Sequence, residues 1–328
     1  MNKALLQVEG LNIAFKSDYG TFSAVSDIGF EVYEGESIGI VGESGCGKSV
    51  TAMSLMRLLK EPPAIISGTI DFDGRDIRSL SKKDIQRLRG NDIAMIFQEP
   101  MTSLNPVFTC GSQISEAIIK HQGLSKGEAR KKTIDILQMV GIALPEKRVD
   151  EYPHQLSGGM RQRIMIAMAL SCQPKLLIAD EPTTALDVTI QAQILELIKS
   201  LKKQLGMSMV LITHDLGVVA EMTERVLIMY AGEIVEQADV FSIFEDPKHP
   251  YTVGLLESIP KMNESKENLY VIEGVVPSPS AMPKGCRFSP RCSKCMPKCI
   301  VQAPPATIIT ELHTVRCWLY TGIDGKGV

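Results

Sequence analysis

The feature that most constrains the fold of this chain is a glycine-rich octapeptide, GESGCGKS, at residues 42–49. It matches the pattern G-x-x-x-x-G-K-[ST] and lies between an apolar run of strand length, SIGIV, and a segment with helical periodicity, KSVTAMSLMRLLK. In such a loop, backbone N–H groups and the N-terminus of the following helix surround phosphate oxygens. Lys48 would reach the β- and γ-phosphates, and Ser49 would bind Mg²⁺. The motif predicts a nucleotide-binding chain, but kinases, GTPases, helicases and transport ATPases all share it.

Further apolar runs of strand length follow along the chain: DIAMIFQ, KLLIADEP, SMVLITHD and RVLIMYAG. Continuous runs rich in Ile, Val and Leu suit strands that are buried on both faces, as in a parallel sheet. Helical patterns such as VTIQAQILELIKSLKKQL alternate with them, so the pattern predicts a doubly wound α/β core. Mostly helical sequence at about 105–170 interrupts the alternation and predicts an inserted helical subdomain. The chain becomes proline-rich near its end, which divides it into a nucleotide-binding domain at 1–248 and an extension at 249–328.

The composition of the 328 residues narrows the class of protein. Hydrophobic residues make up 44% of the chain and charged residues 22%, which is enough for a full core and two domains. The formal net charge of −3 gives no reason to expect nucleic acid as the main partner. The N-terminus has no apolar core of signal-peptide length, and no stretch approaches the roughly 18 apolar residues of a membrane span. We therefore expect a cytosolic chain that can still dock on a membrane protein.

An acidic pair ends the apolar run LLIADEP at 176–182. Asp180 is placed to hold the Mg²⁺ shell, and Glu181 could polarise an attacking water. An acidic strand end is common by itself, but here it accompanies a complete phosphate-binding loop. The pair therefore indicates that the bound nucleotide is hydrolysed.

The stretch YPHQLSGGMRQR at 152–163 resembles the signature of ABC-type ATPases, whose usual form is LSGGQ; Met160 replaces the glutamine here. The strings IFQEP, TTALD and LITHD resemble the other motifs of that family and stand in the expected order. The resemblance implies an ABC-type P-loop ATPase core with a parallel sheet, an N-terminal antiparallel β subdomain and the inserted helical subdomain. It also implies that two such domains face each other head to tail, with each ATP between the loop of one and the signature of the other.

The resemblance assigns catalytic roles to Glu181, His214 and Gln98. His214 would contact the γ-phosphate and hold in line the water that Glu181 activates. The expected Mg²⁺ ligands are Ser49, Gln98 and Asp180.

ATP itself would contact both the loop and the partner's signature. Ser157, Gly158 and Gly159 open a helix, so that their N–H groups aim at a γ-phosphate. Phe15 is the aromatic that we expect to stack on adenine, with Tyr19 as the alternative. The expected ATP-binding residues are Phe15, Gly42, Glu43, Ser44, Gly45, Cys46, Gly47, Lys48, Ser49, Val50, Ser157, Gly158, Gly159 and Asp187.

The stretch HPYTVGLLESIP at 249–260 resembles the extension of ATPase subunits in oligopeptide and dipeptide (peptide/nickel-type) ABC importers. That subfamily also reads IFQEPMTSLNP and EPTTALDVTIQAQIL, and both strings stand here at 96–106 and 181–195. The resemblance implies an ATP-hydrolysing translocase subunit that powers uptake of di- or oligopeptides. Import of nickel or another small solute by the same machinery is one alternative, and a non-transport ABC ATPase acting on nucleic acid is a second.

The same resemblance implies partners and a location. The expected partners are a second ABC ATPase subunit, preferably a paralogue, two transmembrane permease subunits and an extracellular or periplasmic solute-binding protein, with no nucleic acid. The expected location is the cytoplasmic face of the cell membrane, where the chain would bind peripherally.

Cysteines gather near the end of the chain, in GCRFSPRCSKCMPKC at 285–299 and at Cys317. A reducing cytosol disfavours disulfides. In the importer subfamily the tail often reads C-x-F-x-x-R-C followed by two further cysteines, which implies a structural [4Fe–4S] cluster on Cys286, Cys292, Cys299 and Cys317. Zinc, which the C-x2-C spacing of Cys292 and Cys295 keeps possible, and unmetallated thiols are the alternatives. The chain would then contain a small Cys-rich C-terminal extension that binds a metal, besides ATP and Mg²⁺.

Overall fold

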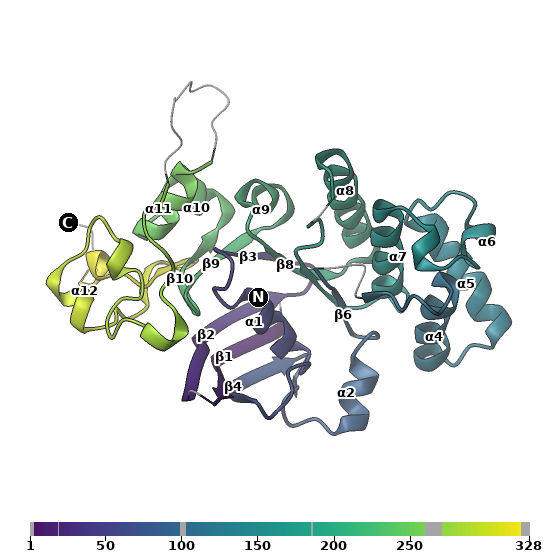
Figure 1. The fold of residues 1–328 in the computed structure, drawn as a ribbon, viewed down its shortest axis with the longest axis horizontal. Coiled ribbons are helices and arrows are strands. Elements are labelled where there is room, and N and C mark those ends of the chain that lie inside the picture. The colour runs from purple at the N-terminus through teal and green to yellow at the C-terminus, as the bar shows by residue number, and fades with distance from the viewer. Residues whose placement is uncertain (1–2, 19, 99–102, 185, 260–270, 323–328) are drawn as a thin grey trace. The chain divides into compact units, whose positions relative to one another are not determined.

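The computed structural model of the chain describes residues 3–18, 20–98, 103–184, 186–259 and 271–322. They group into two compact units, each built from separate stretches of sequence. The first unit consists of residues up to 5, 32–37 and 73–212, and the second consists of 6–31, 38–72 and the residues from 213 on. Figure 1 shows the elements of both units.

Three parallel strands form the sheet of the first unit. They are β6 (Ile93–Ile96), β7 (Leu176–Asp180) and β8 (Ser208–Thr213), with β7 paired to both of the others. Every residue of these strands is buried. Burial on both faces explains why the three segments are continuous apolar runs in the sequence.

The helices of the first unit follow the predicted pattern. They are α2 (Lys82–Leu88), α4 (Cys110–Gln122), α5 (Lys126–Met139), α6 (Pro145–Arg148), α7 (Gly158–Leu170) and α8 (Val188–Leu205), with a 3₁₀ turn η1 (Pro153–Gln155) and a short strand β5 (Arg75–Asp76). Thr109, Ser125, Ser157 and Asp187 each begin a helix by accepting a backbone N–H on the side chain. Helices α4, α5 and α7 pack against one another (Figure 1), which forms the predicted helical subdomain.

The second unit contains two sheets. In the first, β1 (Ala4–Ser17) lies between β2 (Gly20–Tyr33) and β4 (Ala64–Phe72) and pairs antiparallel with β4. In the second, the strand order is β11 (Thr307–Thr310), β12 (His313–Val315), β10 (Glu233–Asp239), β9 (Arg225–Tyr230) and β3 (Ser37–Val41). The pairing of β3 with β9 is parallel, and the other pairings of this sheet are antiparallel.

Short helices complete the second unit. They are α1 (Lys48–Leu55), α9 (Leu216–Met222), α10 (Val240–Glu245), α11 (Pro250–Glu257) and α12 (Pro297–Val301), with 3₁₀ turns η2 (Pro279–Ala281), η3 (Ser289–Arg291) and η4 (Trp318–Tyr320). Together the units confirm the predicted α/β class, with parallel strands, an antiparallel β sheet near the N-terminus and a helical subdomain. The domain bounds at 1–248 and 249–328 stay a prediction.

A membrane span would require a long apolar helix of about 20 residues. In the part of the chain that the structure describes, every helix is too short or too polar to be one.

Candidate functional site

The glycine-rich loop leaves the buried strand β3 and ends at helix α1. A Cβ atom at Gly42 would lie 2.0 Å from the Met229 carbonyl oxygen, so a larger residue cannot fit there. Gly47 has φ 102°, which favours glycine, and a Cβ there would lie 2.8 Å from the Ala24 carbonyl oxygen. The two glycines therefore let the loop pass close to neighbouring backbone.

Lys48 is held inside this loop. The residue is only 5% exposed, and its Nζ donates to the carbonyl oxygens of Gly42 (2.7 Å) and Glu43 (3.0 Å). Burial raises the pKa of the neighbouring Cys46 thiol, so this thiol stays uncharged near neutral pH. The loop thus carries the ammonium group of Lys48 beside an uncharged thiol, and an ammonium group is suited to bind phosphate.

The remaining loop residues are more open. Ser44 and Gly45 are exposed, and Ser49 and Val50 are half-buried in the first turn of α1. The N-terminus of this helix carries a partial positive charge, which suits an anion.

In the first unit, the structure brings together the predicted catalytic residues Gln98 and Glu181. Glu181 follows β7, and its Oε2 accepts hydrogen bonds from Gln98 Nε2 (3.1 Å) and Thr184 Oγ1 (2.8 Å). Its backbone has φ 45°, an uncommon conformation for a residue with a side chain, and its N–H donates to the Ile212 carbonyl oxygen (2.8 Å). Asp180, the last residue of β7, is 4% exposed. The carboxylate of Glu181 is therefore oriented by two donors at the end of a buried strand.

The signature residues form the N-terminus of α7. Ser157 Oγ accepts the Met160 N–H (3.4 Å), and Ser157 and Gly158 are exposed. A Cβ atom at Gly159 would lie 3.1 Å from Ile190 Cγ2, so glycine relieves a tight contact with α8. This exposed helix end carries free backbone donors and a partial positive charge, which suit an anion.

Other predicted residues lie on other elements of the chain. His214 is exposed between β8 and α9 in the second unit. Asp187 caps α8 through a hydrogen bond from the Ile190 N–H (3.0 Å), which is a structural role. Phe15 on β1 stacks on Phe22 with ring centroids 5.8 Å apart. Tyr19 lies outside the described residues.

The prediction of a [4Fe–4S] cluster, with zinc as its alternative, is wrong. Among the described residues, which include Cys286, Cys292, Cys299 and Cys317, no group of three or more His, Cys, Asp or Glu side chains is arranged to hold a metal ion. Burial, with a smaller contribution from Cys299 and Cys317, raises the pKa of Cys286 to about 12. The Cys286 thiol therefore stays protonated near neutral pH.

The spacing of the cysteines does not show how deeply the tail is buried in the folded chain. Phe288 is 3% exposed and packs against Tyr230 and Tyr251, with ring centroids 5.1 Å and 5.4 Å apart. Cys286 and Cys292 pack against the same apolar cluster. Apolar packing therefore supplies what the metal was expected to supply.

Sequence reasoning also missed two contacts to the loop. Tyr251 and Arg291, both in the extension, hydrogen-bond to Glu43. Tyr251 lies within the HPY motif and Arg291 within C-x-F-x-x-R-C, and these two motifs are the signal in the sequence that could have indicated the contacts.

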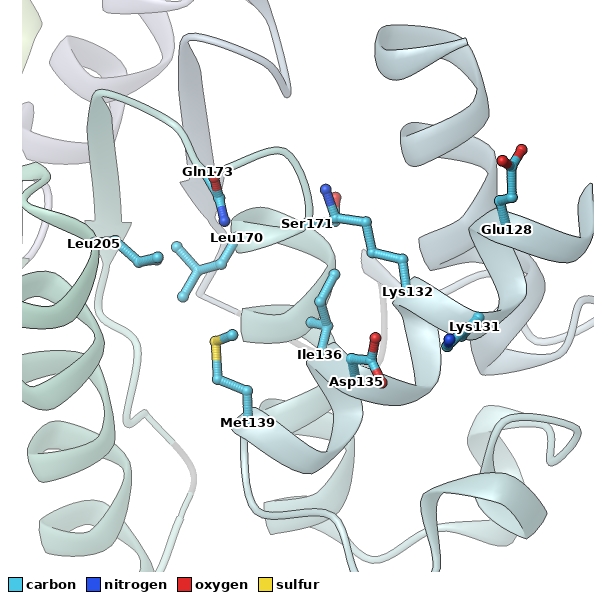
Figure 2. Close-up of a pocket in the computed structure, with 10 residues that line it drawn as sticks. All are labelled: Glu128, Lys131, Lys132, Asp135, Ile136, Met139, Leu170, Ser171, Gln173 and Leu205. Carbon is cyan, nitrogen blue, oxygen red and sulfur yellow. The ribbon is translucent and has the colours of Figure 1, made fainter. Parts of the chain in front are cut away.

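A separate cavity of about 400 Å³ lies in the first unit (Figure 2). Ile136, Met139, Leu170 and Leu205 give it an apolar wall, and Lys131, Lys132, Asp135 and Glu128 lie around it with Ser171 and Gln173. Its lining contains none of the residues predicted for the ATP site.

Two family models match the chain. The model described as "ABC transporter" matches residues 25–184, and the model described as "Oligopeptide/dipeptide transporter, C-terminal region" matches residues 235–299. The second match covers the segment that contains Tyr251 and Arg291.

The chain is also similar to curated proteins over nearly its whole length. It is 51% identical to the oligopeptide transport ATP-binding protein AppD of Bacillus subtilis (strain 168), over 96% of this chain and 97% of that protein. It is 48% identical to the dipeptide transport ATP-binding protein DppD of Escherichia coli (strain K12), over 96% of each.

Solved structures share the fold. A dimeric post-hydrolysis state of the ATP-binding cassette MJ0796, bound to ADP and Pi, superposes with a TM-score of 0.64. It is 29% identical and covers 72% of this chain and 98% of its own. Clostridium perfringens cbiO1, part of the ABC transporter complex cbiONQ, gives a TM-score of 0.63 at 30% identity, over 78% of this chain and 96% of its own.

Proposed function

Because the chain belongs to the family of oligopeptide and dipeptide ABC transporter ATP-binding proteins, we propose that it hydrolyses ATP to drive uptake of di- or oligopeptides. The observation that carries this proposal is identity of about half the residues, over nearly the full length, to both an oligopeptide and a dipeptide transport protein. Both family models match the one chain. The named relatives do not favour the alternatives of nickel transport or action on nucleic acid.

The phosphate-binding part of the proposal rests on the loop 42–49. Lys48 would neutralise charge on the β- and γ-phosphates, and the backbone N–H groups at the start of α1 would donate to their oxygens. Phe15 would stack on the adenine.

The Mg²⁺ part rests on Ser49, Gln98 and Asp180. All three offer oxygen ligands, which Mg²⁺ prefers, and Asp180 is a buried carboxylate at a strand end. The ion, when bound, would offset the negative charge of the phosphates.

The catalytic part rests on Glu181. Its carboxylate would accept a proton from the water that attacks the γ-phosphate, and the amide of Gln98 and the hydroxyl of Thr184 would orient it. His214 would contact the γ-phosphate. Hydrolysis of the γ-phosphate depends mainly on preorganised side chains that position the water and the phosphate, because the protein forms no covalent bond to the substrate.

The proposed assembly contains two ATP-binding subunits, two permease subunits and a solute-binding protein. The exposed N-terminus of α7 supports pairing, because its free donors would complete the ATP site of a second subunit. A dimer is the form of one solved cassette with this fold. We place the chain at the cytoplasmic face of the membrane, bound peripherally to the permease subunits.

Glu181→Gln tests the chemistry. It should retain ATP binding and lower turnover by roughly 10²–10⁴-fold, because the amide cannot accept the water proton. Glu196→Gln is the matched control, since Glu196 is exposed on α8. Normal turnover in Glu181→Gln would refute the role of Glu181.

Transport is tested in cells that lack the gene and its paralogues. Uptake of labelled di- and tripeptides should return with the wild-type gene but not with Glu181→Gln. Nickel uptake measured in parallel decides the alternative: restored nickel uptake without restored peptide uptake would refute the peptide assignment.

A further inference from the structure

Two side chains of the C-terminal extension contact the first variable residue of the phosphate-binding loop. Tyr251 Oη accepts the backbone N–H of Glu43 at 3.0 Å. Arg291 Nη1 donates to both carboxylate oxygens of Glu43, at 3.1 Å and 2.9 Å. All three residues belong to the second unit. Glu43 is thus held through its backbone and through its side chain.

Arg291 is itself fixed and largely removed from water. Its side chain is 6% exposed, Nε donates to the Glu273 carbonyl oxygen (2.9 Å), and Nη2 donates to that of Ile272 (3.1 Å). The guanidinium also lies over the ring of Tyr230, 5.8 Å from its centroid. A buried guanidinium with this many partners has one preferred position, so it can position the Glu43 carboxylate with which it pairs.

Tyr251 is fixed by packing. It is 0% exposed, and its ring lies 4.7 Å from that of Tyr230 and 5.4 Å from that of Phe288, centroid to centroid. The hydroxyl oxygen therefore lies at a defined point beneath the loop, where it satisfies the Glu43 N–H.

A second arginine of the same segment supports the loop indirectly. Arg287 Nη1 donates to the Ala231 carbonyl oxygen, and Nε pairs with Glu233 Oε1 at 2.9 Å. The next residue, Gly232, donates its N–H to the Cys46 carbonyl oxygen at 2.9 Å. Residues 286–292 therefore contact the loop directly at Glu43, and they support it at Cys46 through the turn that contains Ala231 and Gly232.

The contacts at Glu43 continue to Lys48. The Glu43 carbonyl oxygen accepts from Lys48 Nζ, and so does that of Gly42. The Glu43 N–H and the Gly42 carbonyl belong to one peptide group. A change in the orientation of this peptide group would therefore move a carbonyl oxygen that accepts from Lys48 Nζ. In addition, an unpaired Glu43 carboxylate in this loop would repel the phosphates of ATP.

From these contacts we infer that Arg291 and Tyr251 are positioning residues for the phosphate-binding loop, so that the extension sets the ATP affinity of the cassette. Arg291 neutralises and orients Glu43, and Tyr251 fixes its peptide. The inference rests on the proposed function, because it takes ATP as the ligand of the loop.

The test is ATP binding by the full chain and four variants: Arg291→Gln, Tyr251→Phe, Glu43→Gln and the double variant that combines Arg291→Gln with Glu43→Gln. Dissociation constants are measured with a fluorescent ATP analogue and by competition with ATP. We expect Arg291→Gln to weaken ATP binding about 10-fold, which corresponds to ~1.4 kcal/mol. The double variant should recover to within about 3-fold of wild type, because it removes the unpaired carboxylate. Lys294→Gln is the matched control: it removes the same charge from an exposed position three residues along, and its affinity should be unchanged.

Amide hydrogen exchange supplies a readout that needs no ATP. Exchange at residues 42–49 should be faster in Arg291→Gln and in Tyr251→Phe, which keeps the ring and removes only the hydroxyl acceptor. Tyr251→Phe also keeps the inference testable if Arg291→Gln fails to fold.

The outcomes distinguish the proposed ATP-binding role of the loop from the positioning of the loop by Arg291 and Tyr251. Failure of wild type to bind ATP, or normal ATP binding by Lys48→Ala, would refute the proposed role of the loop, while the exchange measurement would still decide the bracing. Wild-type affinity together with wild-type loop exchange in both Arg291→Gln and Tyr251→Phe would overturn the inference. A double variant no tighter than Arg291→Gln would overturn the part played by the ion pair.

Discussion

Lowering the pH from 7.5 to 5 should destabilise the C-terminal extension through a single side chain, His249. This residue caps α11: it is 1% exposed, and its Nδ1 accepts the Tyr251 N–H at 3.1 Å. Its backbone N–H donates to Glu236 Oε2 at 2.9 Å, and its ring packs against Phe288. Burial lowers the pKa of His249 from 6.5 to about 4, although the charge of Glu236 opposes the shift. The folded extension therefore holds this imidazole neutral.

The sign and size of the effect follow from the pKa of His249 in the unfolded chain, 6.5, and in the folded chain, about 4. Above about pH 7 the imidazole is neutral in the folded and the unfolded chain, so the free energy of unfolding does not depend on its titration. As the pH falls through 6.5, the unfolded chain binds a proton that the folded chain binds only near pH 4. The free energy of unfolding should therefore fall by about 2 kcal/mol between pH 7.5 and 5, and by ~3 kcal/mol by pH 4. Hydrogen bonds lower the pKa of Glu236 below 4.5 despite its burial, so its titration lies below this window.

The chain offers a local probe for this measurement. Its one tryptophan, Trp318, lies in the extension, where Nε1 donates to the Gln302 carbonyl oxygen at 2.9 Å. Urea unfolding followed by tryptophan fluorescence at pH 7.5 and at pH 5 therefore reports on the extension. His249→Asn keeps an acceptor for the cap and removes the titrating group, so its stability should change much less with pH. His154→Asn, at an exposed position, is the control and should behave as wild type.

The reasoning would be refuted if wild type and His249→Asn lost the same free energy of unfolding, within about 0.5 kcal/mol, between pH 7.5 and 5. Such a result would mean that His249 accepts a proton in the folded state near its ordinary pKa, and hence that water reaches it.

Three further predictions concern packing, the loop and the thiols. Phe288→Ala should lower the stability of the extension by about 3–5 kcal/mol, because it empties a site among three aromatic rings; a loss under ~1 kcal/mol in the same fluorescence assay would contradict this. Gly42→Ala should abolish ATP binding, because its Cβ would lie 2.0 Å from the Met229 carbonyl oxygen, and binding at wild-type affinity would count against the loop geometry. Iodoacetamide followed by mass spectrometry should modify the exposed Cys295 well before Cys286, whose pKa burial raises to about 12, and the reverse order would contradict the burial.

The amino-acid sequence by itself determined the features that depend on adjacent residues. The octapeptide at 42–49 requires glycine where the backbone passes close to its neighbours, so composition and spacing alone predict the loop. The apolar run that ends at Asp180 predicted a fully buried strand because burial on both faces removes the polar alternation. Ser157, Gly158 and Gly159 were expected to open a helix, and α7 begins there with the Ser157 side chain accepting an N–H of the first turn.

Features that join distant residues were decided only by the tertiary structure. Glu43 meets Tyr251 and Arg291, which stand 208 and 248 residues further along the chain, and no local pattern states such a pairing. The resemblance of the cysteine spacing to that of the importer subfamily implied a metal, because spacing takes no account of the segments that cover the tail. In the fold, Phe288 packs on Tyr230 of β9, so the extension shares an aromatic core with the preceding sheet, and burial raises the pKa of Cys286 to about 12. Burial depends on every segment that covers a side chain, and it is therefore a property of the assembled fold, which residue spacing does not contain.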